Sequence, residues 1–287
     1  MALKVQSIQR DIAAEVAGVD LRDDIPQETV RQIEDALNKY VVLVFRNQAI
    51  DDDMQQRFIE KFGPPVATTN IKELVRKGHK PHLLDIATVD EDGNPLQQGS
   101  FYHLYMLANQ LWHTDGSQSQ PPIRLTALSA RTLPPAPPNT EFADMRAAWD
   151  ALPEARKAEL EGLQAEHSIV YSRGLLGLGK EAFSEESASQ RPPVAHALVR
   201  TQSSGRKSLY LSSHASHIVG WPVERGRQLL QELTELATQR QFVYAHQWQA
   251  GDLVMWNDAA SMHRALPYSD PHPRILRWSA VRELEPV

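Results

Sequence analysis

The stretch Asn109 to Asp115, with the sequence NQLWHTD, contains two side chains that can bind a metal ion, His113 and Asp115. On an extended segment the side chains alternate between faces, so these two residues point the same way and can bind one ion. A second stretch, Trp256 to Arg264 (WNDAASMHR), adds His263, 150 residues after the first histidine. Two imidazoles and one carboxylate on one face of a metal, with the opposite positions open, are typical of non-haem Fe(II) oxygenases. We therefore expect a fold that brings these two stretches together.

A His-x-Asp pair is short enough to occur by chance, so the neighbouring residues matter. Arg274 lies eleven residues after His263 and begins an apolar run. Thr140 opens a Thr-Glu-Phe segment that follows the rigid proline-rich connector at 134–138. These residues together point to more than an isolated metal motif.

With these residues in view, the sequence resembles the taurine dioxygenase/TfdA family of Fe(II)- and 2-oxoglutarate-dependent oxygenases. It most resembles the 2,4-dichlorophenoxyacetate dioxygenase branch of that family. The similar segments span nearly the whole chain, and besides the two stretches above they are Gly18–Arg22, Val42–Arg46, Phe62–Pro64, Asn139–Ala148, Gly205–Tyr210, His214–His217 and Gly251–Trp256. Several such segments are far more specific than the metal triad alone.

The resemblance implies a role for each of these residues. His113, Asp115 and His263 would be the catalytic ligands of Fe(II), and O2 would be the oxidant. Arg274 would bind the distal carboxylate of 2-oxoglutarate through its planar fork, and Thr140 would add a hydroxyl. Trp256, next to the second stretch, would either contact the cofactor or pack in the core.

The substrate end of the site is where the sequence departs from the family. The resemblance places Asn109 and His214 beside the substrate, but many relatives have a second arginine, four residues after the first, where this chain has Trp278. In a strand, Trp278 shares a face with Arg274 while Arg277 points away. Two alternatives remain open: another cation holds the acid, with Lys72, Arg76, His214 or a displaced Arg277 as candidates, or the substrate is less anionic and more aromatic.

The main functional hypothesis is hydroxylation of the carbon next to the ether oxygen of an aryloxyalkanoate. The products would be a phenol, an oxo acid, succinate and CO2. One alternative is a taurine-like sulfonate or sulfate-ester dioxygenase, which would release sulfite or sulfate. Another is a non-catalytic cupin-like protein that binds the metal without forming succinate.

The composition narrows the class of protein. With 287 residues and 41% hydrophobic content, the chain can form one large core, and we expect a single domain over 1–287. The net charge of -6 argues against a nucleic-acid partner, and the absence of cysteine excludes thiolate ligands. The start of the chain lacks the apolar core of a secretory signal, and no apolar run is long enough to span a membrane. We expect a cytoplasmic homo-oligomer that acts on a small aromatic or acidic molecule.

Hydrophobic periodicity predicts many short strands with helices outside them. Helices are predicted over 28–40, 51–62, 144–163 and from Pro222 to 236, and strands over 3–22, 41–45, 125–133, 242–248, 253–256 and 275–281, with a hairpin at 197–212. This pattern favours a mainly β fold with flanking helices: a double-stranded β-helix, that is, a cupin-like jelly roll. The less regular segments 66–108 and 172–193 are predicted to be lids over the active site.

Overall fold

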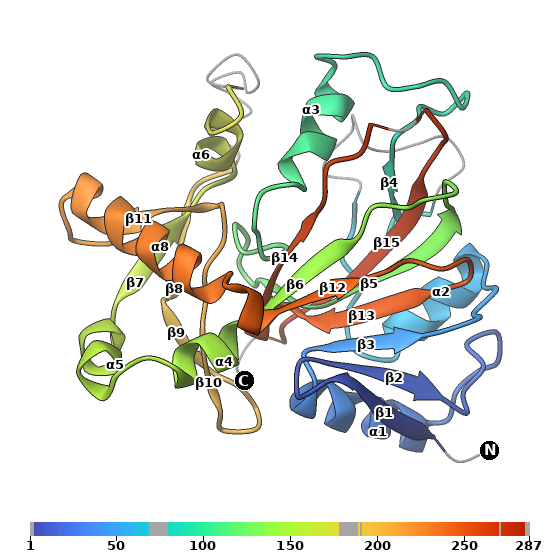
Figure 1. Ribbon diagram of the computed structural model, residues 1–287, viewed down its shortest axis with the longest axis horizontal. Helices are drawn as coiled ribbons and strands as arrows, with labels where there is room; N and C mark the ends of the chain where they lie inside the picture. The colour runs from blue at the N-terminus through green and yellow to red at the C-terminus, as the bar shows by residue number, and fades with distance from the viewer. Residues whose placement is uncertain (1–2, 69–79, 178–188, 190, 270, 285–287) are drawn as a thin grey trace.

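The computed structural model describes residues 3–68, 80–177, 189, 191–269 and 271–284 (Figure 1). Its main sheet has the strand order β1 (Lys4–Gln9), β2 (Ala13–Ala17), β3 (Val42–Phe45), β13 (Leu253–Asn257), β5 (Ile123–Thr132), β15 (Ile275–Arg282) and β4 (Leu84–Ala87). A second sheet has the order β12 (Val243–His246), β6 (Thr140–Asp144) and β14 (Ser261–Ala265). A third has the order β11 (Ala215–Ile218), β7 (Gln164–His167) and β8 (Val194–Ala197), and β9 (Val199–Thr201) pairs with β10 (Lys207–Leu209) as a hairpin.

The central strands of the main sheet are apolar on both faces because both faces are covered. In β3, Val42 and Val44 belong to one hydrophobic cluster, whereas Leu43 and Phe45 belong to another. The neighbouring β13 divides its residues in the same alternating way. The sequence run at 41–45 therefore forms a strand buried between two layers.

The outer face of the main sheet is covered by α1 (Gln27–Lys39) and α2 (Asp52–Glu60). Val30, Ile33 and Leu37 of α1 are buried at helical spacing against this face. The carboxylate of Asp51 caps α2 by accepting a hydrogen bond from the Met54 N–H. This layer fixes the main sheet from the outside and leaves its inner face for the site.

The inner face of the main sheet packs against the second sheet. Phe142 of β6 and Tyr244 of β12 share a buried cluster with Val254 and Trp256 of β13 and with Leu276 of β15. The registers are antiparallel throughout the second sheet. Two facing, largely antiparallel sheets with helices outside them form the jelly roll that the sequence predicted.

The rest of the chain forms a lobe beside the jelly roll (Figure 1). Its helices are α4 (Met145–Asp150), α5 (Glu154–Leu160), α6 (Ile169–Gly174) and α8 (Val223–Ala237), and the short 3-10 turns η2 (Arg240–Phe242) and η3 (Asp258–Ala260) follow in the chain. Leu229, Leu230 and Leu233 of α8 pack into the cluster that includes Ala215 and Ile218 of β11. Short strands and helices thus form a third layer. The apolar periodicity of the sequence predicted only part of this layer.

The segment 66–108 contains more regular structure than a lid without secondary structure would have. It includes β4 and the helix α3 (Phe101–Ala108), whose first turn is capped by the Ser100 hydroxyl.

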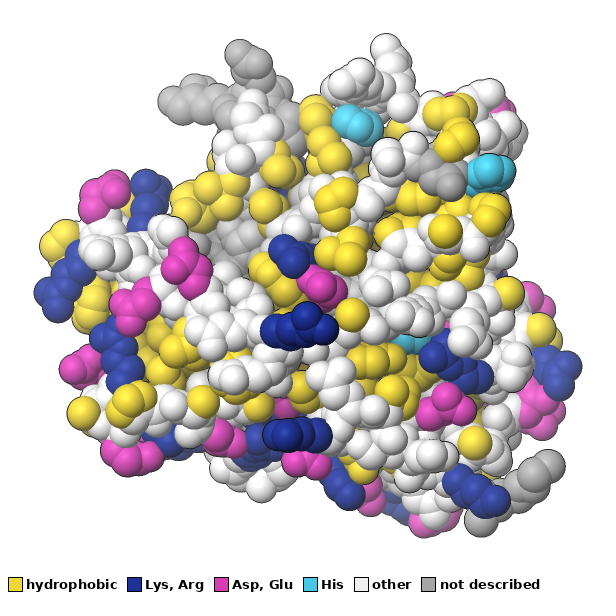
Figure 2. All heavy atoms as spheres, in the orientation of Figure 1, with side chains coloured by type: hydrophobic (Ala, Val, Ile, Leu, Met, Phe, Trp, Pro, Cys, Tyr) yellow, Lys and Arg dark blue, Asp and Glu magenta, His cyan; other side chains and the backbone are white. Residues whose placement is uncertain are grey.

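In the visible face of Figure 2, Lys and Arg side chains are interspersed with Asp and Glu side chains. None of the described helices is long and apolar enough to cross a membrane.

Candidate metal centre and active site

The main chain brings the two histidines together. His113 and His263 form an antiparallel bridge, in which each backbone N–H donates to the carbonyl of the other residue at 3.0 and 2.8 Å. Two residues further on, the Ala265 N–H donates to the Asn109 carbonyl at 2.7 Å. The stretch 109–113 is therefore held against the edge of β14, and residues far apart in sequence become neighbours.

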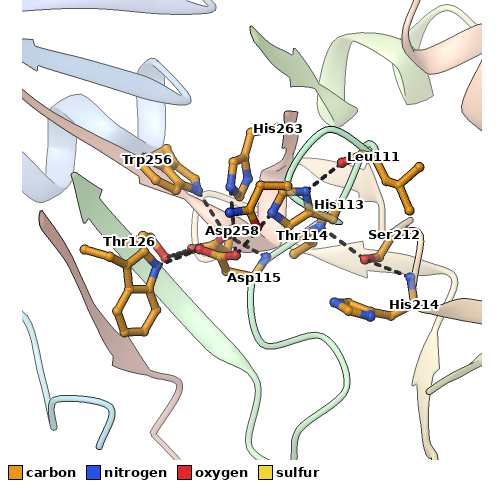
Figure 3. Close-up of polar contacts among 12 residues, drawn as sticks. Leu111, His113, Thr114, Asp115, Thr126, Ser212, His214, Trp256, Asp258 and His263 are labelled. Atoms are coloured by element: carbon orange, nitrogen blue, oxygen red, sulfur yellow. Dashed lines mark hydrogen bonds and ion pairs between the residues drawn. The ribbon is translucent and has the colours of Figure 1, made fainter. Parts of the chain in front are cut away.

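The side chains of His113, Asp115 and His263 converge on one point (Figure 3). Oδ1 of Asp115 lies 3.5 Å from Nε2 of His113 and 3.8 Å from Nε2 of His263. Nδ1 of His113 donates to the Leu111 carbonyl at 2.7 Å, which leaves the Nε2 lone pair for a metal. Burial lowers the pKa of His113 and lowers that of His263 to about 3, so both imidazoles are neutral. Two neutral nitrogens and one carboxylate oxygen form a donor set that fits Fe(II).

The carboxylate of Asp115 is oriented by several neighbours (Figure 3). Its Oδ2 accepts a hydrogen bond from Nε1 of Trp278 at 2.9 Å and lies 3.3 Å from the Thr126 hydroxyl. Its backbone N–H donates to Oδ1 of Asp258 at 3.2 Å, and Asp258 in turn accepts from Nε1 of Trp256 and from Thr126. Burial and the charge of Asp115 raise the pKa of Asp258 well above its usual range. This network leaves Oδ1 as the oxygen that faces the two histidines.

Arg274 and Thr140 offer unused hydrogen-bond donors at a second point of the site. Arg274 is 5% exposed, and among the described residues its Nε and Nη2 atoms have no hydrogen-bond partner. Burial lowers its pKa to about 10, which still leaves the guanidinium charged at neutral pH. The Thr140 hydroxyl oxygen accepts from Nε1 of Trp248 at 3.0 Å, so its hydrogen is available. A buried cation with free donors and a hydroxyl in the wall of the same cavity fit the distal carboxylate of an oxo-diacid such as 2-oxoglutarate.

One cavity of about 900 Å³ connects these groups. Of the residues singled out from the sequence, those that line it are Asn109, His113, Asp115, Thr140, His214, His263, Arg274 and Trp278. Nδ1 of His214 lies 2.8 Å from the Ser172 hydroxyl, which itself donates to the Ile169 carbonyl, so the ring donates through Nδ1 and presents Nε2 as an acceptor. Burial, followed by the charge of Arg173, places the pKa of His214 well below its ordinary value.

Among the described residues singled out from the sequence, Trp256 and Arg277 do not line this cavity. Trp256 is fully buried in the core, with its ring centroid 4.7 Å from that of His263, so it packs against a metal ligand. Arg277 points to the other face of β15 and lies 3.2 Å from the buried carboxylate of Asp85. Lys72, like Arg76, lies outside the described residues.

The structure also identifies residues that the sequence reading overlooked. Arg173 of α6 and Tyr105 of α3 line the cavity, with the guanidinium carbon 4.9 Å from the tyrosine ring centroid. Asp258 anchors the backbone of Asp115 by accepting a hydrogen bond from its N–H. No sequence signal distinguished Arg173 from a surface arginine.

The described parts of the two segments that were predicted to be lids contribute to the cavity wall. Thr68, Leu84 and Tyr105 come from 66–108, and Arg173 and Arg191 come from 172–193. Residues 69–79, 178–188 and 190 lie outside the described residues.

Comparison with known proteins places these features in a family. The family model described as "Taurine catabolism dioxygenase TauD, TfdA family" matches residues 4–279. The chain is 45% identical over 267 residues to the alpha-ketoglutarate-dependent 2,4-dichlorophenoxyacetate dioxygenase of Cupriavidus pinatubonensis, which covers 92% of each chain. It is 40% identical to the enzyme of the same name from a Burkholderia species, over 96% of this chain and 93% of the relative. A crystal structure of AAD-2 in complex with Mn(II) and N-oxalylglycine superposes with a TM-score of 0.91 and 42% identity, over 100% of this chain and 98% of the other.

Proposed function

Because the chain belongs to the taurine catabolism dioxygenase TauD, TfdA family, we propose that it is a 2-oxoglutarate-dependent dioxygenase that hydroxylates the carbon next to the ether oxygen of an aryloxyalkanoate. The hydroxylated product collapses to a phenol and an oxo acid. The observation that carries this proposal is one cavity lined both by the His113, Asp115 and His263 cluster and by Arg274, whose Nε and Nη2 atoms have no hydrogen-bond partner among the described residues. The relatives named as 2,4-dichlorophenoxyacetate dioxygenases support the aryloxy acid as substrate.

Each residue of the site has a distinct task in this reaction. His113, Asp115 and His263 would hold Fe(II) on one face, and Arg274 with Thr140 would fix the distal carboxylate of 2-oxoglutarate. When bound, the iron and 2-oxoglutarate supply the oxidising power, with O2 as the oxidant and succinate and CO2 as by-products. The remaining task of the protein is to orient one C–H bond of the substrate toward the metal and to exclude water.

The cavity wall is suited to an aromatic acid. Apolar and aromatic side chains, among them Leu84, Ile169 and Trp278, line it together with the few polar groups described above. His214 presents Nε2 as a hydrogen-bond acceptor to the same space. We propose Asn109 and His214 as substrate-contacting residues and do not include Arg277, which is paired with Asp85.

The described parts of 66–108 and 172–193 would serve as walls that shield the substrate. We also propose that the enzyme forms one catalytic domain and works in the cytoplasm as a homo-oligomer. Sedimentation analysis of the purified protein would test the subunit number.

A product assay tests the proposed reaction. With Fe(II), ascorbate, 2-oxoglutarate and 2,4-dichlorophenoxyacetate, we expect phenol and succinate in equal amounts. Asp115→Ala, which removes a metal ligand, serves as the control and should form neither product. Sulfite from taurine or sulfate from alkyl sulfates, without phenol from any aryloxy acid, would contradict the proposed substrate. Absence of succinate with every substrate, despite bound iron and 2-oxoglutarate, would contradict the reaction itself.

A further inference from the structure

The substrate proposed above is an acid, and its carboxylate needs a partner in the cavity. The indole N–H of Trp278 is already donated to Oδ2 of Asp115 at 2.9 Å. An indole has a single donor, so Trp278 cannot also bind a carboxylate. The residue at position 278 therefore orients a metal ligand in this chain and leaves the substrate acid to another group.

Among the described residues, four arginines line the cavity: Arg173, Arg191, Arg274 and Arg282. Arg274 is the residue proposed above, with Thr140, to bind 2-oxoglutarate. Nη1 of Arg282 donates to the Pro121 carbonyl at 2.8 Å, and Arg191 is only half-buried. Arg173 is 8% exposed, so it is the other deeply buried cation of the described wall.

Arg173 has no carboxylate partner among the residues that the structure describes. Its described partner is Tyr105: the guanidinium carbon lies 4.9 Å from the centroid of the tyrosine ring, and the two side chains also make a polar contact. Burial lowers the pKa of Arg173, yet a guanidinium stays charged in a protein. A buried charge without a counter-ion is costly, and an anionic ligand would compensate that cost.

Arg173 and Arg274 line the same cavity but have different neighbours. The neighbour of Arg173 in α6, Ser172, holds His214, and the charge of Arg173 contributes to the lowered pKa values of His113 and His214. Arg274 instead lies directly before β15, and its backbone N–H donates to the Thr88 hydroxyl at 3.0 Å. In Figure 1, α3 lies above the strands of the jelly roll and α6 lies above the neighbouring lobe, both toward the top of the view. The two cations can therefore bind two different acids.

His214 does not compete for the substrate acid. Its Nδ1 hydrogen is donated to Ser172, and the Nε2 lone pair that faces the cavity would repel a carboxylate oxygen. It can accept a hydrogen bond from the substrate or from water. Arg173 is thus the group with the charge and burial that a carboxylate requires, and no carboxylate of the described residues pairs with its guanidinium.

We propose that Arg173 binds the acidic group of the substrate and thereby selects aryloxy acids over neutral aryl ethers. This assignment rests on the proposed function and names the residue that recognises the negative charge of the substrate.

The test compares a charged and an uncharged ligand on two arginine variants. Isothermal titration with phenoxyacetate and with phenoxyacetamide is performed on the protein loaded with Mn(II) and N-oxalylglycine, which prevents turnover. For Arg173→Met, we expect phenoxyacetate to bind roughly 10- to 100-fold more weakly, since a charge-assisted pair is lost, and phenoxyacetamide to bind as it does to the wild type. Arg173→Lys keeps the charge without the fork and should lie between the two.

Arg227→Met is the matched control. Arg227 of α8 also lies over a tyrosine of α6, with its guanidinium carbon 5.2 Å from the ring of Tyr171, but it does not line the cavity. This variant should bind both ligands as the wild type does.

If phenoxyacetate binds with the same affinity to the wild type, Arg173→Met and Arg173→Lys, the assignment is overturned. It is also overturned if a folded Arg173 variant loses affinity for phenoxyacetate and phenoxyacetamide to the same extent. Phenol release by the wild-type enzyme is measured separately. If phenol forms while the Arg173 variants bind phenoxyacetate normally, the assignment of Arg173 is wrong but the proposed function is retained. If no aryloxy acid yields phenol, the proposed function fails.

Discussion

At the scale of single residues, the tryptophan at position 278 changes which residues of the site orient the metal ligand and which bind the substrate. Trp278 stands where many relatives have an arginine, and its N–H is directed to the metal ligand Asp115. The Thr126 hydroxyl lies closer to Asp258, at 2.7 Å, than to Asp115, at 3.3 Å. Trp278 is therefore the main side-chain donor to Oδ2 of Asp115 among the described residues.

Replacing Trp278 by Phe removes this donor and keeps an aromatic ring. Groups that orient metal ligands typically contribute about 10- to 100-fold to metal affinity or activity, so we expect Mn(II) to bind at least about tenfold more weakly. A metal titration followed by electron paramagnetic resonance measures this change. Trp221→Phe, at a partly exposed position just before α8, is the control and should bind Mn(II) normally. Unchanged Mn(II) affinity of Trp278→Phe would show that the hydrogen bond does not support the ligand.

At the scale of elements, the lobe beside the jelly roll depends on close approach between α8 and β11. Gly226 of α8 is buried, and a Cβ atom at this position would lie 2.6 Å from the backbone nitrogen of Ile218. A backbone atom within a strand cannot move away as the end of a side chain could. Glycine is therefore required at this contact although it weakens a helix.

Gly226→Ala is expected to destabilise the protein by roughly 1–3 kcal/mol, the usual cost of overpacking, despite the better helix propensity of alanine. Urea denaturation measures the difference in the free energy of unfolding. Gln228→Ala, on the exposed face of the same helix, should be neutral or slightly stabilising. A Gly226→Ala protein as stable as the wild type would mean that α8 can shift away from β11 without cost.

At the scale of the whole molecule, several histidines are buried in the neutral form, and this limits stability in acid. Burial, aided by the charges of His196 and Arg200, lowers the pKa of His167 from 6.5 to about 3. Among the described residues neither ring nitrogen of His167 has a hydrogen-bond partner. Between about pH 6.5 and pH 3, His167 therefore binds a proton in the unfolded chain but not in the folded chain. The free energy of unfolding falls as the pH falls through that window.

Replacing His167 by Phe removes one such group without adding a polar atom. Between about pH 7.5 and about pH 5, the metal-free wild type should lose about 2 kcal/mol more of its unfolding free energy than the variant does. Urea denaturation of both metal-free proteins at the two pH values measures this double difference. His272→Phe, at an exposed position, should lose as much as the wild type. If His167→Phe also loses as much, His167 does not account for the acid sensitivity.

The sequence predicted the elements whose pattern is local. The helices α1, α2 and α8 and the strands β3, β13 and β15 lie where periodicity placed them, to within a few residues. Family membership, the jelly roll and the dependence on 2-oxoglutarate, which the resemblance implied, are confirmed by the comparisons. The short strands β7, β8 and β11 were not predicted, because polar residues interrupt their apolar pattern and neighbouring layers stabilise them.

By itself, the sequence determined which side chains could bind iron and 2-oxoglutarate, and strand alternation placed Trp278 on the same face as Arg274 and Arg277 on the other. Only the tertiary structure decided what those side chains meet. It joined Trp278 to Asp115, placed Asp258 behind the metal ligand and brought Arg173 from a short helix into the cavity wall. The physical reason is that a local pattern encodes the direction of a side chain relative to its own backbone. The partner opposite that side chain comes from a distant segment, and its identity depends on how the layers pack.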